Sequence, residues 1–141
     1  MKSLKQVAAL PYVETERGIL LLLITTRGRG RWTIPKGWPK SGLSDSQLAA
    51  REAFEEAGVA GEIGSKPIGN FTYTKRLHLL SWVRCRVDVY LLHADRQLLS
   101  WPEQESRKLI WIEPSQAVKL VKEPQLANVL REFDRSTQTA A

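Results

Sequence analysis

The chain has 141 residues, enough for one domain with a buried core, and its 43% hydrophobic and 26% charged residues are ordinary for a soluble globular protein. The longest apolar run, residues 19–24, is far too short to cross a bilayer, which excludes a spanning helix, so we expect no membrane partner. The net charge of +6 suits an anionic ligand, and it leaves nucleic acid open as a partner.

Cysteine content and boundaries favour one cytoplasmic domain. The single cysteine, Cys85, cannot form an internal disulfide, and no long apolar run precedes a small-residue cleavage site near the N-terminus. Cys85 lies in an alternating strand pattern, so we expect it in the core rather than as a nucleophile. We expect a single domain over residues 1–135 and a polar, frayed tail over residues 136–141, in a monomer or a homodimer.

Apolar periodicity predicts strands and helices in mixed order. Strands are expected at residues 6–13, 18–25, 32–34, 68–74, 83–92 and 108–112, and helices at about 44–58, 114–121 and 124–133. The second strand is almost wholly apolar, so it should be central and buried on both faces. The pattern predicts an α/β (α+β) fold with a mixed sheet between helices.

The first helix has clear start and stop signals. Ser44 with Gln47 three residues later matches a capping box, and Gly58 supplies a typical helix end. Asp45 places a negative charge in the first turn, where the helix dipole favours it. A small apolar face, expected to dock on the core opposite the acidic residues, consists of Ala50, Ala53, Phe54 and Ala57.

Three carboxylates form a narrow stripe on this helix. Glu52 and Glu56 fall within roughly 40° of each other, and Glu55 about 60° to the other side. Like charges at this spacing destabilise a helix, and a hard divalent cation with oxygen ligands would offset their repulsion. A solvated acidic surface is the alternative interpretation.

Read in their wider context, these residues resemble the Nudix box. That motif reads Gly, five residues, Glu, seven residues, Arg-Glu, an apolar residue, any residue, Glu-Glu, any residue, Gly and an apolar residue. The matching positions are Gly37, Arg51, Glu52, Ala53, Glu55, Glu56, Gly58 and Val59. The first box glutamate is replaced by Leu43, which cannot bind a metal. Similarity extends to the Trp-Thr-Ile-Pro-Lys-Gly stretch at 32–37, to Trp-Pro-Glu at 101–103 and to Trp111.

The resemblance implies a Nudix-type α/β/α sandwich and hydrolysis of a diphosphate bond. It implies that Glu52, Glu55 and Glu56 bind Mg²⁺, with Mn²⁺ possible, and that Glu52 could instead be the general base. Arg51 resembles the box arginine that orients a glutamate; a surface ion pair with Glu55 is the alternative.

Other acidic residues could complete the site. The resemblance places a further glutamate for metal binding or base catalysis in the loop before the last strand, where Glu103 and Glu105 lie. Asp45 could replace the missing box glutamate, but it lies roughly 10 Å along the helix axis from Glu52 and has a structural role as an N-terminal acid.

Basic residues crowd the approach to the box and indicate a phosphate-rich small molecule. The candidate substrate-binding residues are Arg31, Lys36, Lys40, Lys75 and Arg76, with Arg27 and Arg29 nearby. The entry sequence is most similar to the diphosphoinositol-polyphosphate and dinucleoside-polyphosphate hydrolase branch. Alternatives are a sanitising hydrolase of oxidised nucleoside triphosphates or nucleotide sugars, and a non-catalytic nucleotide- or RNA-binding module.

Overall fold

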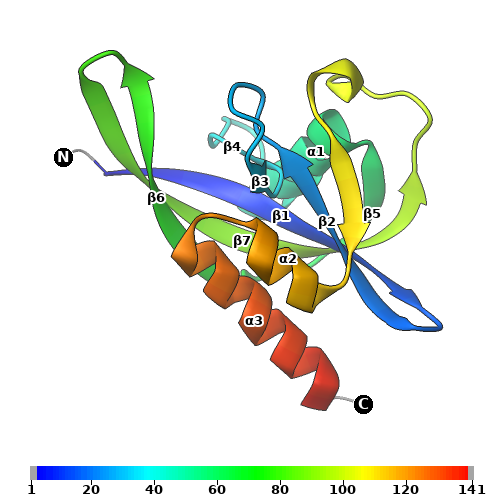
Figure 1. Cartoon of the computed structure of the whole chain (residues 1–141). Coiled ribbons are helices and arrows are strands. Elements are labelled where there is room, and N and C mark those ends of the chain that lie inside the picture. The colour runs from blue at the N-terminus through cyan, green and yellow to red at the C-terminus, as the bar shows by residue number, and fades with distance from the viewer. Residues whose placement is uncertain (1–2, 140–141) are drawn as a thin grey trace.

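A computed structural model of the protein describes residues 3–139 (Figure 1). The strands in this part of the chain are β1 (Ser3–Thr15), β2 (Gly18–Thr25), β3 (Trp32–Thr33), β4 (Lys36–Gly37), β5 (Val59–Ile63), β6 (Gly69–His78), β7 (Ser81–Gln97) and β8 (Leu109–Ile112). Its helices are α1 (Asp45–Ala57), α2 (Pro114–Leu120) and α3 (Pro124–Thr139), and a 3₁₀ turn, η1, spans Gln104–Ser106.

The strands form one mixed sheet whose main path runs β3–β2–β1–β7–β5. β1 and β7 pair in parallel through its middle, from Ser3 opposite Arg84 to Tyr12 opposite His93. The other pairs along this path are antiparallel, and so are three pairs outside it: β4 with β1, β6 with β7, and β8 with β2. Because β1 and β7 each have several partners, this parallel pair holds the whole sheet together.

Apolar cores cover both faces of the sheet. On one face, α2 and α3 lie over the sheet, and Leu126 and Leu130 of α3 pack in the same core as Phe71. On the other face, α1 packs Leu48 and Ala53 into a second core. The expected α/β/α sandwich with a mixed central sheet is therefore confirmed (Figure 1).

The expectations for the central strands are also confirmed. β2 is buried from Leu21 to Thr25, with alternate side chains in the two cores, as its continuous apolar run predicts. Cys85 of β7 is fully buried and lies in the core of the described structure.

The helix α1 begins and ends as predicted, but its docking face differs from the expectation. The backbone N–H of Gln47 donates to Ser44 Oγ at 3.2 Å, and the Ser44 N–H donates to Gln47 Oε1 at 2.9 Å, which completes the capping box. Phe54, expected in the core, is 40% exposed, whereas Glu52 and Glu56 are buried. The helix therefore turns its carboxylates inward, because Leu48, Ala49 and Ala53 rather than Phe54 fill the space against the sheet.

The predictions were wrong for the strands β5, β6 and β7. β5 was not expected, because its short Val-Ala-Gly-Glu-Ile sequence alternates only weakly. It is held by pairing with the polar end of β7, where Gly61 sits so close to the His93 carbonyl that a Cβ would overlap it. β6 and β7 also extend further than predicted, to meet in a long hairpin over residues 69–89.

The C-terminal prediction was also wrong in extent. α3 continues to Thr139, six residues beyond the expected end, so residues 136–139 belong to a helix rather than to a frayed tail. Hydrogen bonds from Ser136 Oγ to the Phe133 carbonyl and from Thr137 Oγ1 to the Asp134 carbonyl satisfy polar groups in this last turn. The rest of the expected tail, residues 140–141, lies outside the described residues. None of the helices described in residues 3–139 has the length and apolar content to cross a membrane.

The end of α1 provides a stability test. Gly58 adopts φ 67°, and an added Cβ would overlap the Trp101 ring, whereas Gly30 adopts φ 65° with open space around it. Gly58→Ala should lower the free energy of unfolding by about 1–3 kcal/mol, and Gly30→Ala by about 1 kcal/mol or less, because only Gly58 adds a steric clash to the backbone strain. Urea unfolding of both variants measures the difference. Equal losses of stability in the two variants would show that the Trp101 ring does not restrict the side chain at position 58.

Candidate active site

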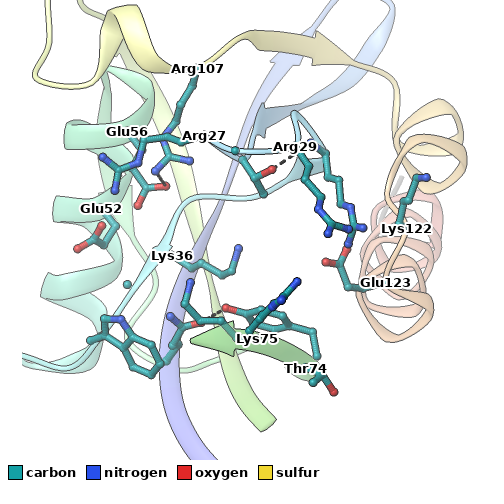
Figure 2. Close-up of a pocket in the computed structure, with 18 of the residues that line it drawn as sticks. Arg27, Arg29, Lys36, Glu52, Glu56, Thr74, Lys75, Arg107, Lys122 and Glu123 are labelled. Atoms are coloured by element: carbon teal, nitrogen blue, oxygen red, sulfur yellow. Dashed lines mark hydrogen bonds and ion pairs between the residues drawn. The ribbon is translucent and has the colours of Figure 1, made fainter. Parts of the chain in front are cut away.

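An open cavity of about 990 Å³ lies between α1, the loop after β2, β6 and the start of α3 (Figure 2). Its acidic lining residues are Glu52, Glu55, Glu56, Glu103 and Glu123. Its basic lining residues are Arg27, Arg29, Arg31, Lys36, Lys40, Lys75, Arg76, Arg107 and Lys122. Positive charge therefore dominates the walls, and the buried carboxylates of α1 form a distinct acidic pole.

Glu52 and Glu56 form that acidic pole because they lie one turn apart on the inward face of α1. Their exposed fractions are only 8% and 4%. Burial raises the pKa of Glu56 to about 9, and a hydrogen bond with Glu52 adds to the increase. Two like carboxylates held together out of water thus retain a proton at neutral pH.

Arg107 links this pair to the loop that precedes β8. Its guanidinium donates to Glu103 Oε1 at 2.9 and 3.1 Å and to the Thr25 carbonyl at 3.1 Å. It also lies 3.5 Å from Glu56 Oε1, with only 12% of its side chain exposed. Because little water surrounds Arg107, its positive charge acts strongly on Glu56 and partly neutralises it. Its hydrogen bonds also hold Glu103 at the cavity.

Lys36 occupies the middle of the cavity, between Glu52 and Glu56 on one side and Glu123 on the other (Figure 2). Burial lowers the pKa of Lys36, while the attraction of Glu56 and Glu123 counteracts that decrease. The ammonium group lies 5.2 Å from the centre of the Tyr73 ring. This cation–π contact and the nearby carboxylates favour the charged form of Lys36 against the effect of burial.

Close packing around the site explains the motif glycine Gly37 and the tryptophan Trp111. A Cβ on Gly37 would overlap the Glu52 carboxylate, so only glycine lets β4 approach α1 this closely. At the C-terminal end of α1, the Glu103 N–H donates to the Glu55 carbonyl at 3.0 Å, and the Gln97 amide donates to the carbonyls of Ala57 and Gly58. Trp111 in turn donates from Nε1 to Gln97 Oε1 at 3.3 Å. With the capping box at Ser44, these hydrogen bonds fix the helix at both ends.

Arg51 and Glu55 form an ion pair at the edge of the site. The Arg51 Nε lies 3.0 Å from Glu55 Oε1, and the Arg51 side chain is 52% exposed. Both interpretations of Arg51 share this contact, because a surface ion pair and an orienting arginine have the same geometry here. Glu55 also lines the cavity, next to Glu56 in the sequence of α1.

Of the other predicted acidic residues, only Glu103 lies at the cavity. Glu103 lines the cavity, whereas Glu105 is exposed on η1 and does not. Asp45 is bound to Lys5 and lies outside the cavity lining, which agrees with a structural role. Leu43, at the position of the first box glutamate, is half-buried and packs against the core beneath α1. Neither Asp45 nor Leu43 supplies a carboxylate to the cavity.

The donors present fit a divalent metal ion as a two-carboxylate site. In residues 3–139, no three His, Cys, Asp or Glu side chains are gathered closely enough to hold one ion, so the predicted three-glutamate set is not assembled in this arrangement. Glu52 and Glu56 do contact each other, and a bound cation would lower the free-energy cost of burying both carboxylates. Mg²⁺ is commonly held by one or two carboxylates and by substrate phosphates, so this pair suits it.

The predicted basic residues converge, and the structure adds several that the sequence reasoning missed. Arg31, Lys36, Lys40, Lys75 and Arg76 all line the cavity, although they come from separate segments. The missed residues that line it are Gln6, Trp38, Thr72, Tyr73, Arg107, Lys122 and Glu123. Only the i,i+4 spacing of Glu103 and Arg107 gave a sequence signal, because the approach of α3 and β6 is a tertiary effect.

Comparison with known proteins identifies the family. The NUDIX domain pattern matches residues 3–133 of this chain. Nudix hydrolase 13, mitochondrial, of Arabidopsis thaliana is 27% identical over 128 residues, which cover 87% of this chain and 63% of the relative. Diphosphoinositol polyphosphate phosphohydrolase 3-beta of Bos taurus is 32% identical over 120 residues, which cover 83% and 68%. About a third of each relative therefore lies outside the similarity.

A solved structure shares the fold along nearly the whole chain. A binary complex of the C. elegans Ap4A hydrolase superposes with a TM-score of 0.71 at 21% identity, covering 96% of this chain and 98% of that one. The fold is therefore a Nudix-type sandwich, in which an acidic helix faces a basic cavity. The chain belongs to the Nudix family and is a Nudix-type hydrolase.

The buried acidic pair predicts a pH-dependent stability difference. The folded state raises the pKa of Glu56 from 4.5 to about 9, so the folded protein keeps a proton that the unfolded chain loses. The free energy of unfolding therefore falls as pH rises from about 4.5 toward 9. Metal-free Glu56→Gln should match the wild type near pH 5. Near pH 8 it should melt roughly 3 °C higher, a gain on the order of 1 kcal/mol.

Differential scanning calorimetry in EDTA at both pH values measures this effect. Glu16→Gln, at an exposed turn between β1 and β2, is the matched control and should show no pH-dependent difference. A lower Tm for Glu56→Gln near pH 8 would mean that Arg107 and Lys36 stabilise a charged Glu56.

Gly37 allows a test of how the Glu52 carboxylate is positioned. Gly37→Ala should displace Glu52, weaken Mg²⁺-dependent stabilisation and lower kcat about 100-fold, because misplacing a reacting group by about 1 Å has effects of that size. Isothermal titration with Mg²⁺ and steady-state kinetics measure the two effects. Gly28→Ala, in open space on the cavity loop, is the control and should retain both properties. Unchanged Mg²⁺ affinity in Gly37→Ala would remove Glu52 from the ligand set.

Proposed function

We propose that this protein hydrolyses a diphosphate bond of a phosphate-rich substrate in a divalent-metal-dependent reaction. Dinucleoside polyphosphates and diphosphoinositol polyphosphates are the substrate classes that the site favours. The observation that carries the proposal is the cavity itself, where nine Arg and Lys side chains surround a buried carboxylate pair. The relatives include a diphosphoinositol polyphosphate phosphohydrolase, which supports the choice of substrate.

The residues of the cavity divide into two functional groups. Nudix hydrolases generally use divalent metals, and Glu52 and Glu56 would hold the ion, with Glu55 and Glu103 within the same cavity. A bound ion would neutralise phosphate charge and polarise the bond to be cleaved. Lys36 and Arg107 are fixed close to the carboxylates, so they would bind the phosphates nearest the reacting bond.

The more distant cations account for the preference for many phosphates. Arg29, Arg31 and Lys40 lie on loops at the cavity wall and are exposed, so they have freedom to reach a long anionic chain. Each added phosphate could meet a guanidinium or ammonium group in a charge-assisted contact. A two-phosphate sugar nucleotide would leave most of these cations without a partner.

A substrate panel tests the proposal. We expect kcat/KM to be higher for a dinucleoside tetraphosphate and for a diphosphoinositol polyphosphate than for a sugar nucleotide, and expect all activity to require Mg²⁺. Arg31→Ala and Lys40→Ala should each lower kcat/KM for the phosphate-rich substrates roughly tenfold, with a much smaller effect on the sugar nucleotide. Added salt should narrow the preference, because exposed charges are screened over about 10 Å at 0.1 M.

Two controls make the outcome decisive. Arg84→Ala removes an exposed arginine that does not line the cavity, so it should leave every rate unchanged. Glu52→Gln should abolish most turnover and thus exclude a contaminating phosphatase. A salt-independent preference for the sugar nucleotide would reject the substrate assignment. Retention of nucleotide or RNA binding without any Mg²⁺-dependent turnover would favour a non-catalytic module.

A further inference from the structure

The hairpin formed by β6 and β7 projects beyond the body of the molecule and ends in an apolar tip (Figure 1). The tip consists of Leu77, Leu79, Leu80 and Trp82, with exposed fractions of 47%, 75%, 91% and 48%. These are four of the eight large hydrophobic side chains that are exposed in residues 3–139. Apolar side chains gathered on an exposed projection indicate a contact surface rather than scattered exposure.

The turn itself gives no reason for leucine at its end. Leu79 and Leu80 occupy the two-residue connection between His78 and Ser81, a place where Gly, Asn and Asp are favoured. Neither residue has a positive φ, and neither packs on either core of the described structure. Two leucines therefore occupy the most exposed point of the hairpin without stabilising the fold.

Arginines border the apolar tip. Arg76 and Trp82 are opposite each other, and the guanidinium lies 5.6 Å from the centre of the indole ring and donates to the Leu79 carbonyl at 3.0 Å. Directly opposite residues share a face of the hairpin, so Arg84 and Arg86, at alternate positions of β7, lie on the face of Trp82. Leucines at the end, a tryptophan behind them and arginines further back form a graded amphipathic surface.

We propose that this hairpin docks the protein on the surface of an anionic phospholipid bilayer. Leu79 and Leu80 would enter the acyl boundary, Trp82 would lie at the headgroup level, and the arginines would bind lipid phosphates. A convex tip two residues wide suits a deformable lipid surface better than a flat protein interface. A second copy is a poor partner, because a symmetric contact would bring the same arginines together in a chain of net charge +6.

This proposal revises the expectation that the protein has no membrane partner. That expectation rested on the absence of a spanning segment, and peripheral docking through a hairpin does not require one. Arg76 lines the cavity, but the apolar residues of the tip do not, so the tip can be altered without changing the substrate site. Binding and hydrolysis can therefore be measured separately.

Vesicle flotation with the full-length protein tests the proposal. The protein should float with vesicles that contain phosphatidylserine and not with vesicles of phosphatidylcholine alone, and added salt should weaken the binding. The double variant Leu79→Glu/Leu80→Glu should lower the vesicle partition coefficient about tenfold or more, since burial of a leucine contributes an effect of that size. Arg84→Glu should reduce binding to a smaller extent.

Leu99→Glu is the matched control. Leu99 is 94% exposed but follows the opposite end of β7, so its substitution adds the same charge away from the tip and should leave binding unchanged. Hydrolysis in solution should be unchanged in all of these variants. Wild-type protein that fails to float with anionic vesicles at low salt, or equal partition of the leucine double variant, would overturn the proposal. A dimer that the double variant dissociates, without vesicle binding, would assign the tip to self-association instead.

Discussion

The burial of two neighbouring carboxylates on α1 is the constraint around which the rest of the site is arranged. Glu52 and Glu56 face the cavity floor rather than bulk water, and burying like charges is costly unless cations offset it. Arg107 and Lys36, both largely desolvated, partly offset that cost from two other elements. Burial still raises the pKa of Glu56, with a further contribution from Glu52, and a bound divalent ion would favour the ionised form of both carboxylates.

Tight backbone packing maintains this arrangement. Glycine at position 37 allows β4 to lie against the Glu52 side chain, and the loop before β8 is hydrogen-bonded to the end of α1 through Glu103 and Glu55. Leu43 lies where the motif has its first glutamate, and it anchors the entry to α1 on the core. The missing ligand thus removes charge from the site without loosening the helix that carries the remaining glutamates.

Local patterns predicted the elements better than their arrangement. The cap at Ser44, the end at Gly58 and the alternation of β7 depend on neighbouring residues, and the structure has all three. The burial of Phe54 could not be judged correctly from a helical wheel, because the wheel does not show which side of the helix meets the sheet. β5 depends on its pairing with a strand some thirty residues later in the chain, which no local signal reveals. Arg107 and Glu123 reach the cavity through the same kind of distant packing.

The parallel pairing of β1 with β7 also governs how the molecule can be made. Ala8 and Val89 are paired in the sheet, although the strands β2 to β6 and the helix α1 all lie between them along the chain. Such a nonlocal contact is slow to form, since a long loop must close before the contact stabilises anything. A nascent chain that has not yet extended past β7 lacks the centre of its sheet, and α1 then lacks Tyr90 and Leu92 in its core. The complete core beneath α1 can therefore form only after β7 has been synthesised.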